Sequence, residues 1–130
     1  MNITIEFFQT DLIKAIGAGV YEISVTKNDQ SEVLYIGESV FVLVRCAAHL
    51  YELNKNPTYF GFTSKTINDS SVKLKFRLIE KNNEKVLRKK KEIELIKEKK
   101  PLTQSGINDY QKSVEDKILA LTGFLDNKFN

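Results

Sequence analysis

The chain has 130 residues, of which 42% are hydrophobic and 28% are charged, and its formal net charge is +3. This size predicts a single domain over residues 1–130. The longest apolar run, residues 40–44, is far shorter than the roughly 20 residues that span a bilayer, and no secretory pattern opens the chain, which predicts a cytoplasmic protein without a membrane partner. One cysteine and one histidine exclude an internal disulfide and a Cys/His zinc site, so any metal must be held by oxygen.

Basic residues are concentrated in one segment of the chain. Residues 1–72 carry 5 basic and 8 acidic side chains, residues 73–100 carry 12 and 5, and residues 101–130 carry 3 and 4. A concentrated basic segment raises the local potential and releases counterions when it meets phosphates. A solvated helix face has the same composition, so charge alone leaves both interpretations open.

Three segments have the composition of β-strands. Residues 20–25 and 33–36 are β-branched and aromatic, and the polar cluster at 26–31 between them predicts a β-hairpin. Residues 72–79 alternate apolar and basic side chains, which predicts a third strand with one buried face.

The segment that follows Gly37 is ambiguous. Residues 40–44 favour a strand by propensity, whereas the apolar residues continue at helical spacing to residue 53. In a helix, Ser39 could be the N-cap, and Arg45 and His49 would lie one turn apart on one face. In a strand these two side chains would be roughly 13 Å apart.

Two helices are expected in the C-terminal half. Residues 83–100 are strongly helix-forming, with Asn83 as a plausible N-cap and Pro101 as the stop signal, and residues 107–121 have a further helical pattern. At about 100° per residue, the first helix places Glu92 near the core and Glu94 toward water.

Two tripeptides carry a family resemblance. Residues 19–21 (Gly-Val-Tyr) and 35–37 (Tyr-Ile-Gly) resemble the GIY-YIG endonuclease family, with Val20 in place of the usual Ile. Arg45 and His49 follow Tyr35 at the spacing of the Arg and His on that family's first helix.

A third block extends the resemblance to residues 19–104. It is similar to the family's Glu-x-x-Leu-Ile sequence followed by Pro and Asn, and it consists of Glu92, Leu95, Ile96, Pro101 and Gln104. Gln104 stands where the family usually has Asn, so the carboxamide is longer by one methylene.

The resemblance implies a fold and an activity. The expected fold class is α/β (α+β), with a small three-stranded antiparallel sheet flanked by helices. The nuclease core would cover about residues 19–104, between an N-terminal extension and a C-terminal helix. A helix is then expected over about residues 39–53. The expected function is a Mg²⁺-dependent (or Mn²⁺-dependent) endonuclease that hydrolyses DNA phosphodiester bonds.

The resemblance also implies roles for individual residues. Glu92 would be the metal ligand, since Mg²⁺ needs only one or two protein carboxylates. Arg45 would stabilise charge on the phosphate, and as a charge in an apolar stretch it must also find a partner. His49 would act in acid–base chemistry or hydrogen-bond to Tyr21. We expect Tyr21 to be the general base and Tyr35 to orient the phosphate, with the reverse as the alternative.

Nucleic-acid contacts are expected on the basic helix and at one glycine. Cations suited to backbone phosphates would border the site, namely Arg88, Lys89, Lys90 and Lys91. Gly37 would permit close approach of a backbone at the end of its strand.

Several alternatives are open from the sequence. Glu92 could simply pair with Arg88, and His49 could be structural. The aromatic residues of segment 56–62 favour core packing over base stacking. Because Gln104 replaces Asn, a catalytically inactive nucleic-acid-binding module on the same fold is the alternative function, and an interaction-only protein is a third.

Overall fold

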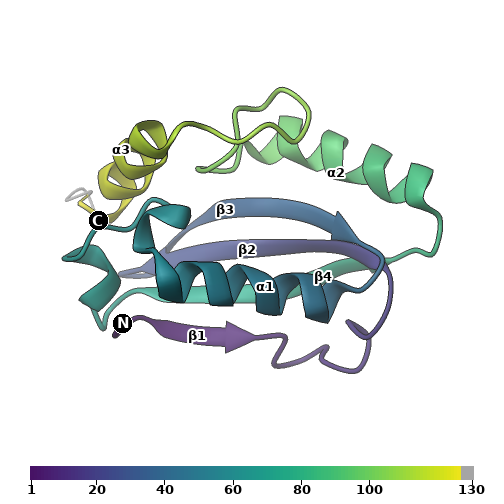
Figure 1. The fold of residues 1–130 in the computed structure, drawn as a ribbon, viewed down its shortest axis with the longest axis horizontal. Helices are drawn as coiled ribbons and strands as arrows, with labels where there is room; N and C mark the ends of the chain where they lie inside the picture. The colour runs from purple at the N-terminus through teal and green to yellow at the C-terminus, as the bar shows by residue number, and fades with distance from the viewer. Residues whose placement is uncertain (127–130) are drawn as a thin grey trace.

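A computed structural model describes residues 1–126, which form a mixed α/β fold around one open sheet (Figure 1). The sheet has the strand order β1-β4-β2-β3, with bounds Thr4–Phe7 (β1), Gly19–Lys27 (β2), Gln30–Ser39 (β3) and Lys73–Lys81 (β4). Strands β4, β2 and β3 are antiparallel, whereas β1 pairs with β4 in parallel. The described sheet therefore has four strands instead of the three expected.

The predicted hairpin joins β2 to β3. Its two central residues, Asn28 and Asp29, have φ angles of 54° and 64°. Two consecutive left-handed residues make the turn whose twist matches that of the flanking strands, and Asn and Asp tolerate this conformation. The hairpin prediction is confirmed.

Three α-helices accompany the sheet: Val42–Lys55 (α1), Lys85–Lys99 (α2) and Val114–Leu125 (α3). The ambiguous segment is helical, but Ser39 ends β3 instead of capping α1. Likewise, the N-cap of α2 is Glu84 and not Asn83. Helix α3 begins later than expected because the Ser113 side chain caps it. No helix within residues 1–126 is long and apolar enough to span a membrane.

Helices α1 and α2 pack on opposite faces of the sheet. Along β2, Val20 joins Leu95 and Ile96 of α2 in a small buried cluster. The next residue, Tyr21, lies in the main core together with Cys46 of α1. Side chains alternate across a strand, so consecutive residues of β2 face opposite sides of the sheet. The same strand therefore contacts both helices.

Strand β3 is the edge of the sheet, and the chain that follows α2 covers it. The backbone amides of Leu102 and Thr103 donate to the carbonyls of Val33 and Leu34. The Gln104 carboxamide accepts from the Ile36 amide at 3.0 Å and donates to the Ile36 carbonyl at 2.8 Å. These bonds satisfy the edge and tie the end of α2 to the Tyr-Ile-Gly strand.

We predict that Gln104→Ala lowers the free energy of unfolding by about 1–3 kcal/mol, because it leaves two buried groups of Ile36 unpaired. Urea denaturation followed by circular dichroism measures this change. Gln9→Ala, at an exposed position, is the matched control and should change stability by less than about 0.5 kcal/mol. Equal stability of the two variants would contradict the role given to Gln104.

Candidate active site

The two motif tyrosines come together because of a glycine. The register of β2 and β3 places Tyr21 opposite Gly37. A Cβ atom on Gly37 would collide with the Tyr21 phenol and lie 2.9 Å from Cε1 of Tyr35. Gly37 is therefore needed for the packing of the two rings. The Tyr21 ring fills the space beside Gly37. The glycine therefore makes room for this ring, and not for the nucleic-acid backbone that we expected there.

A hydrogen-bonded chain runs from the sheet through α1 to the short helix at Pro57–Tyr59. The Tyr21 hydroxyl lies 2.7 Å from Nε2 of His49, and the Tyr59 hydroxyl lies 2.7 Å from Nδ1 of the same ring. The Tyr35 ring packs against the His49 ring with 4.8 Å between centroids. His49 is completely buried, so its ring nitrogens need partners within the protein. The two phenols supply them.

Burial opposes charge on every member of this cluster. It raises the pKa of the Tyr21 phenol well above the ordinary value and also raises that of Tyr35, and the nearby Arg45 guanidinium offsets part of both shifts. Burial, with the repulsion of Arg45, lowers the pKa of His49 to about 3. At neutral pH the cluster is therefore uncharged, and one ring nitrogen of the neutral His49 accepts a hydrogen bond while the other donates one.

Arg45 lies beside the buried cluster on α1 and is exposed to solvent. We expected a partner for it because of its apolar surroundings. Within residues 1–126 it takes part in no ion pair, and its neighbours are the two tyrosines, whose pKa it lowers. Solvent removes the penalty that would have required a partner. The guanidinium is therefore available to an anion from outside.

Glu92 projects from α2 as the helical spacing predicts: it is buried, whereas Glu94 is exposed. Burial raises the pKa of its carboxyl, and Lys89 partly offsets this. The charge of Glu92 in turn raises the pKa of Tyr35, so the carboxyl lies near the tyrosine cluster. The suggested pair with Arg88 is not formed, because the Glu92 partner is Lys89, 3.0 Å from its Oε1.

The surroundings of Glu92 fit a hard cation. Its Oε1 atom is buried and accepts no hydrogen bond among the described residues, because the Lys89 ammonium is close but not aligned to donate. No group of three or more His, Cys, Asp or Glu side chains gathers in residues 1–126. A Mg²⁺ ion bound by Glu92 would therefore complete its shell with few other protein ligands, with waters and with substrate oxygens.

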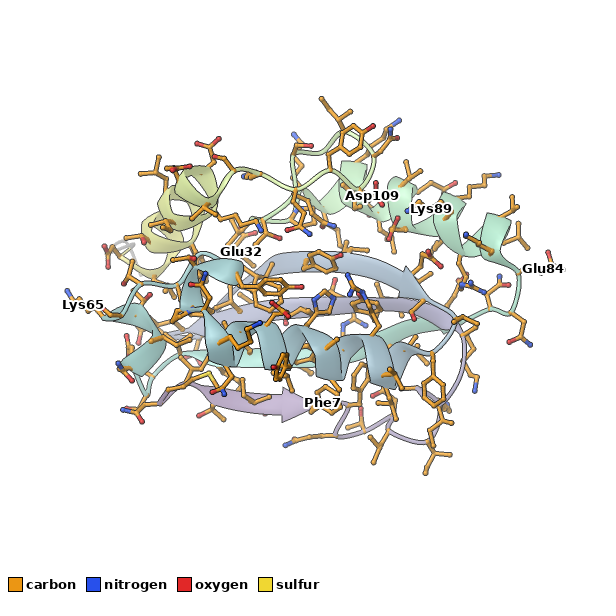
Figure 2. All side chains as sticks on the ribbon, in the orientation of Figure 1. Phe7, Glu32, Lys65, Glu84, Lys89 and Asp109 are labelled. Atoms are coloured by element: carbon orange, nitrogen blue, oxygen red, sulfur yellow. The ribbon has the colours of Figure 1, made fainter. Side chains whose placement is uncertain are left out.

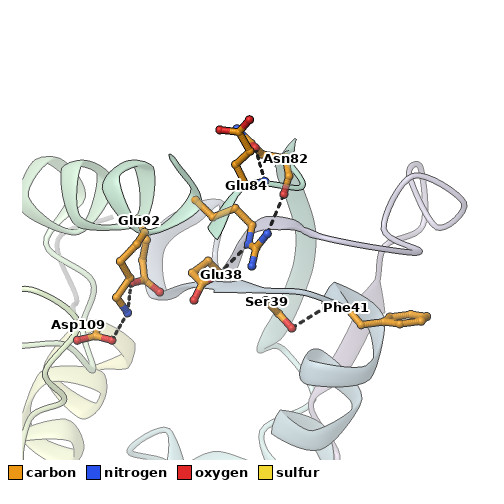
Figure 3. A network of polar contacts seen from close by, with 9 residues as sticks. Glu38, Ser39, Phe41, Asn82, Glu84, Glu92 and Asp109 are labelled. Carbon is orange, nitrogen blue, oxygen red and sulfur yellow. Dashed lines mark hydrogen bonds and ion pairs between the residues drawn. The ribbon is translucent and has the colours of Figure 1, made fainter. Parts of the chain in front are cut away.

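The four basic residues expected to bind phosphate do not form one surface. The Arg88 guanidinium is buried and donates to Glu38 at 2.9 Å and to the Asn82 carbonyl at 3.2 Å (Figure 3). It is therefore a structural residue and not a phosphate contact. Lys89 is engaged by two carboxylates. Lys90 and Lys91 remain, and both line a shallow hollow on the surface of α2.

Gln104 lies beside the site and not in it, since both ends of its buried carboxamide bind the backbone of Ile36. Phe60 and Phe62 are buried, which confirms their assignment to the core. Tyr59 was assigned to the core with them, but it is only half-buried and hydrogen-bonds to His49, and the contact of Asp109 with Lys89 was not predicted. An aromatic residue shortly after the His-bearing helix was the one available signal for Tyr59, and nothing in the sequence pointed to Asp109.

Comparisons with protein-family models, with curated proteins and with solved structures gave no match to this chain. The interpretation of the site therefore depends on its own geometry and chemistry.

We predict that His49 stays neutral well below its ordinary pKa. As the only histidine it gives a single imidazole signal, which should not shift in an NMR titration between pH 8 and pH 5. An imidazole that titrates near pH 6.5 would contradict the buried chain.

The same shift predicts a pH dependence of stability. Between about pH 6.5 and pH 3 the unfolded chain binds one proton more at His49 than the folded chain. This group should therefore make stability fall by about 1.4 kcal/mol per pH unit as the pH decreases. His49→Gln should lack this contribution. The free energy of unfolding of both chains, measured with urea, is plotted against pH, and the difference between the two slopes gives the contribution of His49 without that of the carboxylates.

Proposed function

We propose that this chain is a divalent-metal-dependent endonuclease of the GIY-YIG type that hydrolyses phosphodiester bonds in DNA. The observation that carries the proposal is the convergence of Tyr21, Tyr35 and His49 beneath the exposed Arg45, with the buried Glu92 nearby. These residues come from β2, β3, α1 and α2, elements that are far apart in the chain.

Arg45 supplies the positive charge that a phosphoryl group needs. Its guanidinium can hold two phosphate oxygens at once and stabilise the charge that grows on them during attack. Because it takes part in no ion pair within residues 1–126, no existing ion pair must break before a phosphate binds.

Tyr21 is the residue to which we assign the removal of a proton from the attacking water. Its raised pKa prevents ionisation by itself, so it must pass its own proton on as it accepts another. The His49 ring is 2.7 Å away and can take that proton at Nε2 while Nδ1 releases one to the Tyr59 hydroxyl, so the ring stays neutral as its low pKa requires. The Nδ1 side of the ring faces Tyr59, which is only half-buried and connects the chain to the outside.

Glu92 is the residue that would hold the cation. A bound Mg²⁺ or Mn²⁺ would supply positive charge for the phosphoryl and leaving oxygens. Its charge would also offset the burial penalty of ionising the phenols next to it. The role of Glu92 in this proposal is thus to bring a cation to a cluster that is otherwise poor in charge.

The alternative is a nucleic-acid-binding module without activity on the same fold. Gln104 in place of the usual Asn is the sequence feature that suggests it. The two hydrogen bonds of Gln104 to Ile36 support a role in holding β3, so the longer carboxamide still has a structural use at this position. Activity measurements separate the two functions.

We predict Mg²⁺-dependent cleavage when the chain is incubated with plasmid, branched and single-stranded DNA and with RNA. Glu92→Gln and Arg45→Ala should each lower the rate by about 100-fold or more, since each removes charge stabilisation of the transition state. Arg45→Ala should bind DNA nearly as well as the unaltered chain, because its contribution is greatest in the transition state.

Glu98→Gln is the matched control for Glu92→Gln, because it removes an exposed carboxylate from the same helix outside the hollow lined by Lys90 and Lys91. It should cleave at the rate of the unaltered chain. Cleavage in excess chelator would refute the metal dependence. DNA binding without cleavage under every condition would favour the inactive module.

We predict that DNA lies against Lys90 and Lys91 of α2, which line the surface hollow. The double variant Lys90→Gln/Lys91→Gln should weaken binding about equally for all sequences, because phosphate contacts do not read bases. It should also flatten the slope of log affinity against log salt by about 0.9 for each phosphate that is no longer neutralised. Lys75→Gln on β4 is the comparison, and a larger effect there would place the DNA path across that strand.

A further inference from the structure

Lys89 lies between two carboxylates. Its Nζ atom is 3.0 Å from Oε1 of Glu92 and 2.6 Å from Oδ2 of Asp109 (Figure 3). Glu92 belongs to α2, whereas Asp109 belongs to the segment between α2 and α3. Figure 2 shows the labelled Lys89 and Asp109 next to each other on this side of the molecule. A positive charge here is thus shared by two acidic side chains from different segments.

The two carboxylates differ in their surroundings. The Glu92 side chain is 5% exposed and the Asp109 side chain is 39% exposed. The hydrogen bond from Lys89 lowers the pKa of Asp109, whereas burial raises the pKa of Glu92. Although burial opposes it, pairing with both carboxylates raises the pKa of Lys89. Asp109 is therefore a charged carboxylate at the solvent side of the buried one.

The buried Oε1 atom of Glu92 lacks a hydrogen bond among the described residues although the ammonium is close. Lys89 therefore satisfies the charge of this carboxylate without satisfying its hydrogen-bonding capacity. A buried acceptor of this kind is costly unless it is paired, and a metal ion is one way to pair it. The other titratable neighbour, Glu38, is already bound to Arg88 and is not free for this purpose.

We infer that Asp109 is a second carboxylate ligand of the cation that Glu92 binds, and that the Lys89 ammonium holds this position when no cation is present. The inference rests on the proposed function for the role of Glu92. Mg²⁺ and Mn²⁺ prefer oxygen ligands, and two carboxylates with waters suit both ions. When the cation binds, the Lys89 ammonium leaves the carboxylates and becomes available to a phosphate of the substrate.

The test measures Mn²⁺ binding to the full chain without nucleic acid, through the electron paramagnetic resonance signal of free Mn²⁺. Asp109→Asn should weaken binding by about 10-fold or more, because it removes a charged ligand. Lys89→Met should strengthen binding, since no ammonium then competes with the ion. Asp29→Asn removes a carboxylate from the β2–β3 turn and should leave the affinity unchanged.

A second measurement uses the unaltered chain and requires no variant. Substoichiometric Mn²⁺ should broaden the amide NMR signals of Asn108 to Tyr110 together with those around Glu92, because both segments lie next to the proposed ion. Broadening elsewhere in the chain without these signals, or an Asp109→Asn affinity equal to that of the unaltered chain, would refute the inference. Weaker binding by Lys89→Met would also refute it.

These outcomes are separate from those of the nuclease assay. If the chain binds Mn²⁺ through both carboxylates but cleaves no nucleic acid, the inference about Asp109 holds and the proposed function is wrong. If the chain cleaves DNA but Asp109→Asn binds Mn²⁺ as tightly as the unaltered chain does, the proposed function holds and the inference is wrong.

Discussion

The close approach of Tyr21 to Gly37 across β2 and β3 is the contact on which the cluster depends. Only a residue without a Cβ atom lets the buried phenol lie over the neighbouring strand. From this position the phenol reaches His49 of α1, and His49 in turn reaches Tyr59. The glycine at position 37 of the edge strand β3 is thus required for the hydrogen bond between Tyr21 and His49 of α1.

The other half of the site is held by polar contacts on and beside β3. Gln104 binds both backbone groups of Ile36, which fixes the C-terminal end of α2 against the strand that carries Tyr35. Near the other end of α2, Arg88 is bound to Glu38 of the same strand. A helix fixed at both ends has little freedom to turn, so Glu92 between these contacts keeps its buried position. Residues that resemble surface charges in the sequence are therefore part of the framework.

The sequence predicted what depends on local pattern. The hairpin, the third antiparallel strand and the directions of Glu92 and Glu94 follow from alternation and helical spacing, and the structure confirms them. Strand β1 escaped prediction because it has four residues and forms only by parallel pairing with the distant β4. Arg88 was misassigned because composition cannot show that a carboxylate 50 positions earlier in the chain binds it. Asp109 was missed for the same reason, since its contact with Lys89 is formed only by the fold.

The charges of the site suggest that it is incomplete without a phosphate and a cation. Burial holds Tyr21, Tyr35 and His49 in their uncharged forms, so the tyrosines are weak bases at rest. Two opposite charges flank them: Arg45 is exposed and in no ion pair within residues 1–126, and Glu92 is buried and paired only with a lysine from its own helix. A phosphate would satisfy the first and a divalent cation the second, and the phosphate would share oxygens with that cation. Each would thus favour binding of the other, and the cation would add its positive charge to that of Arg45, which already offsets part of the burial penalty of the phenols.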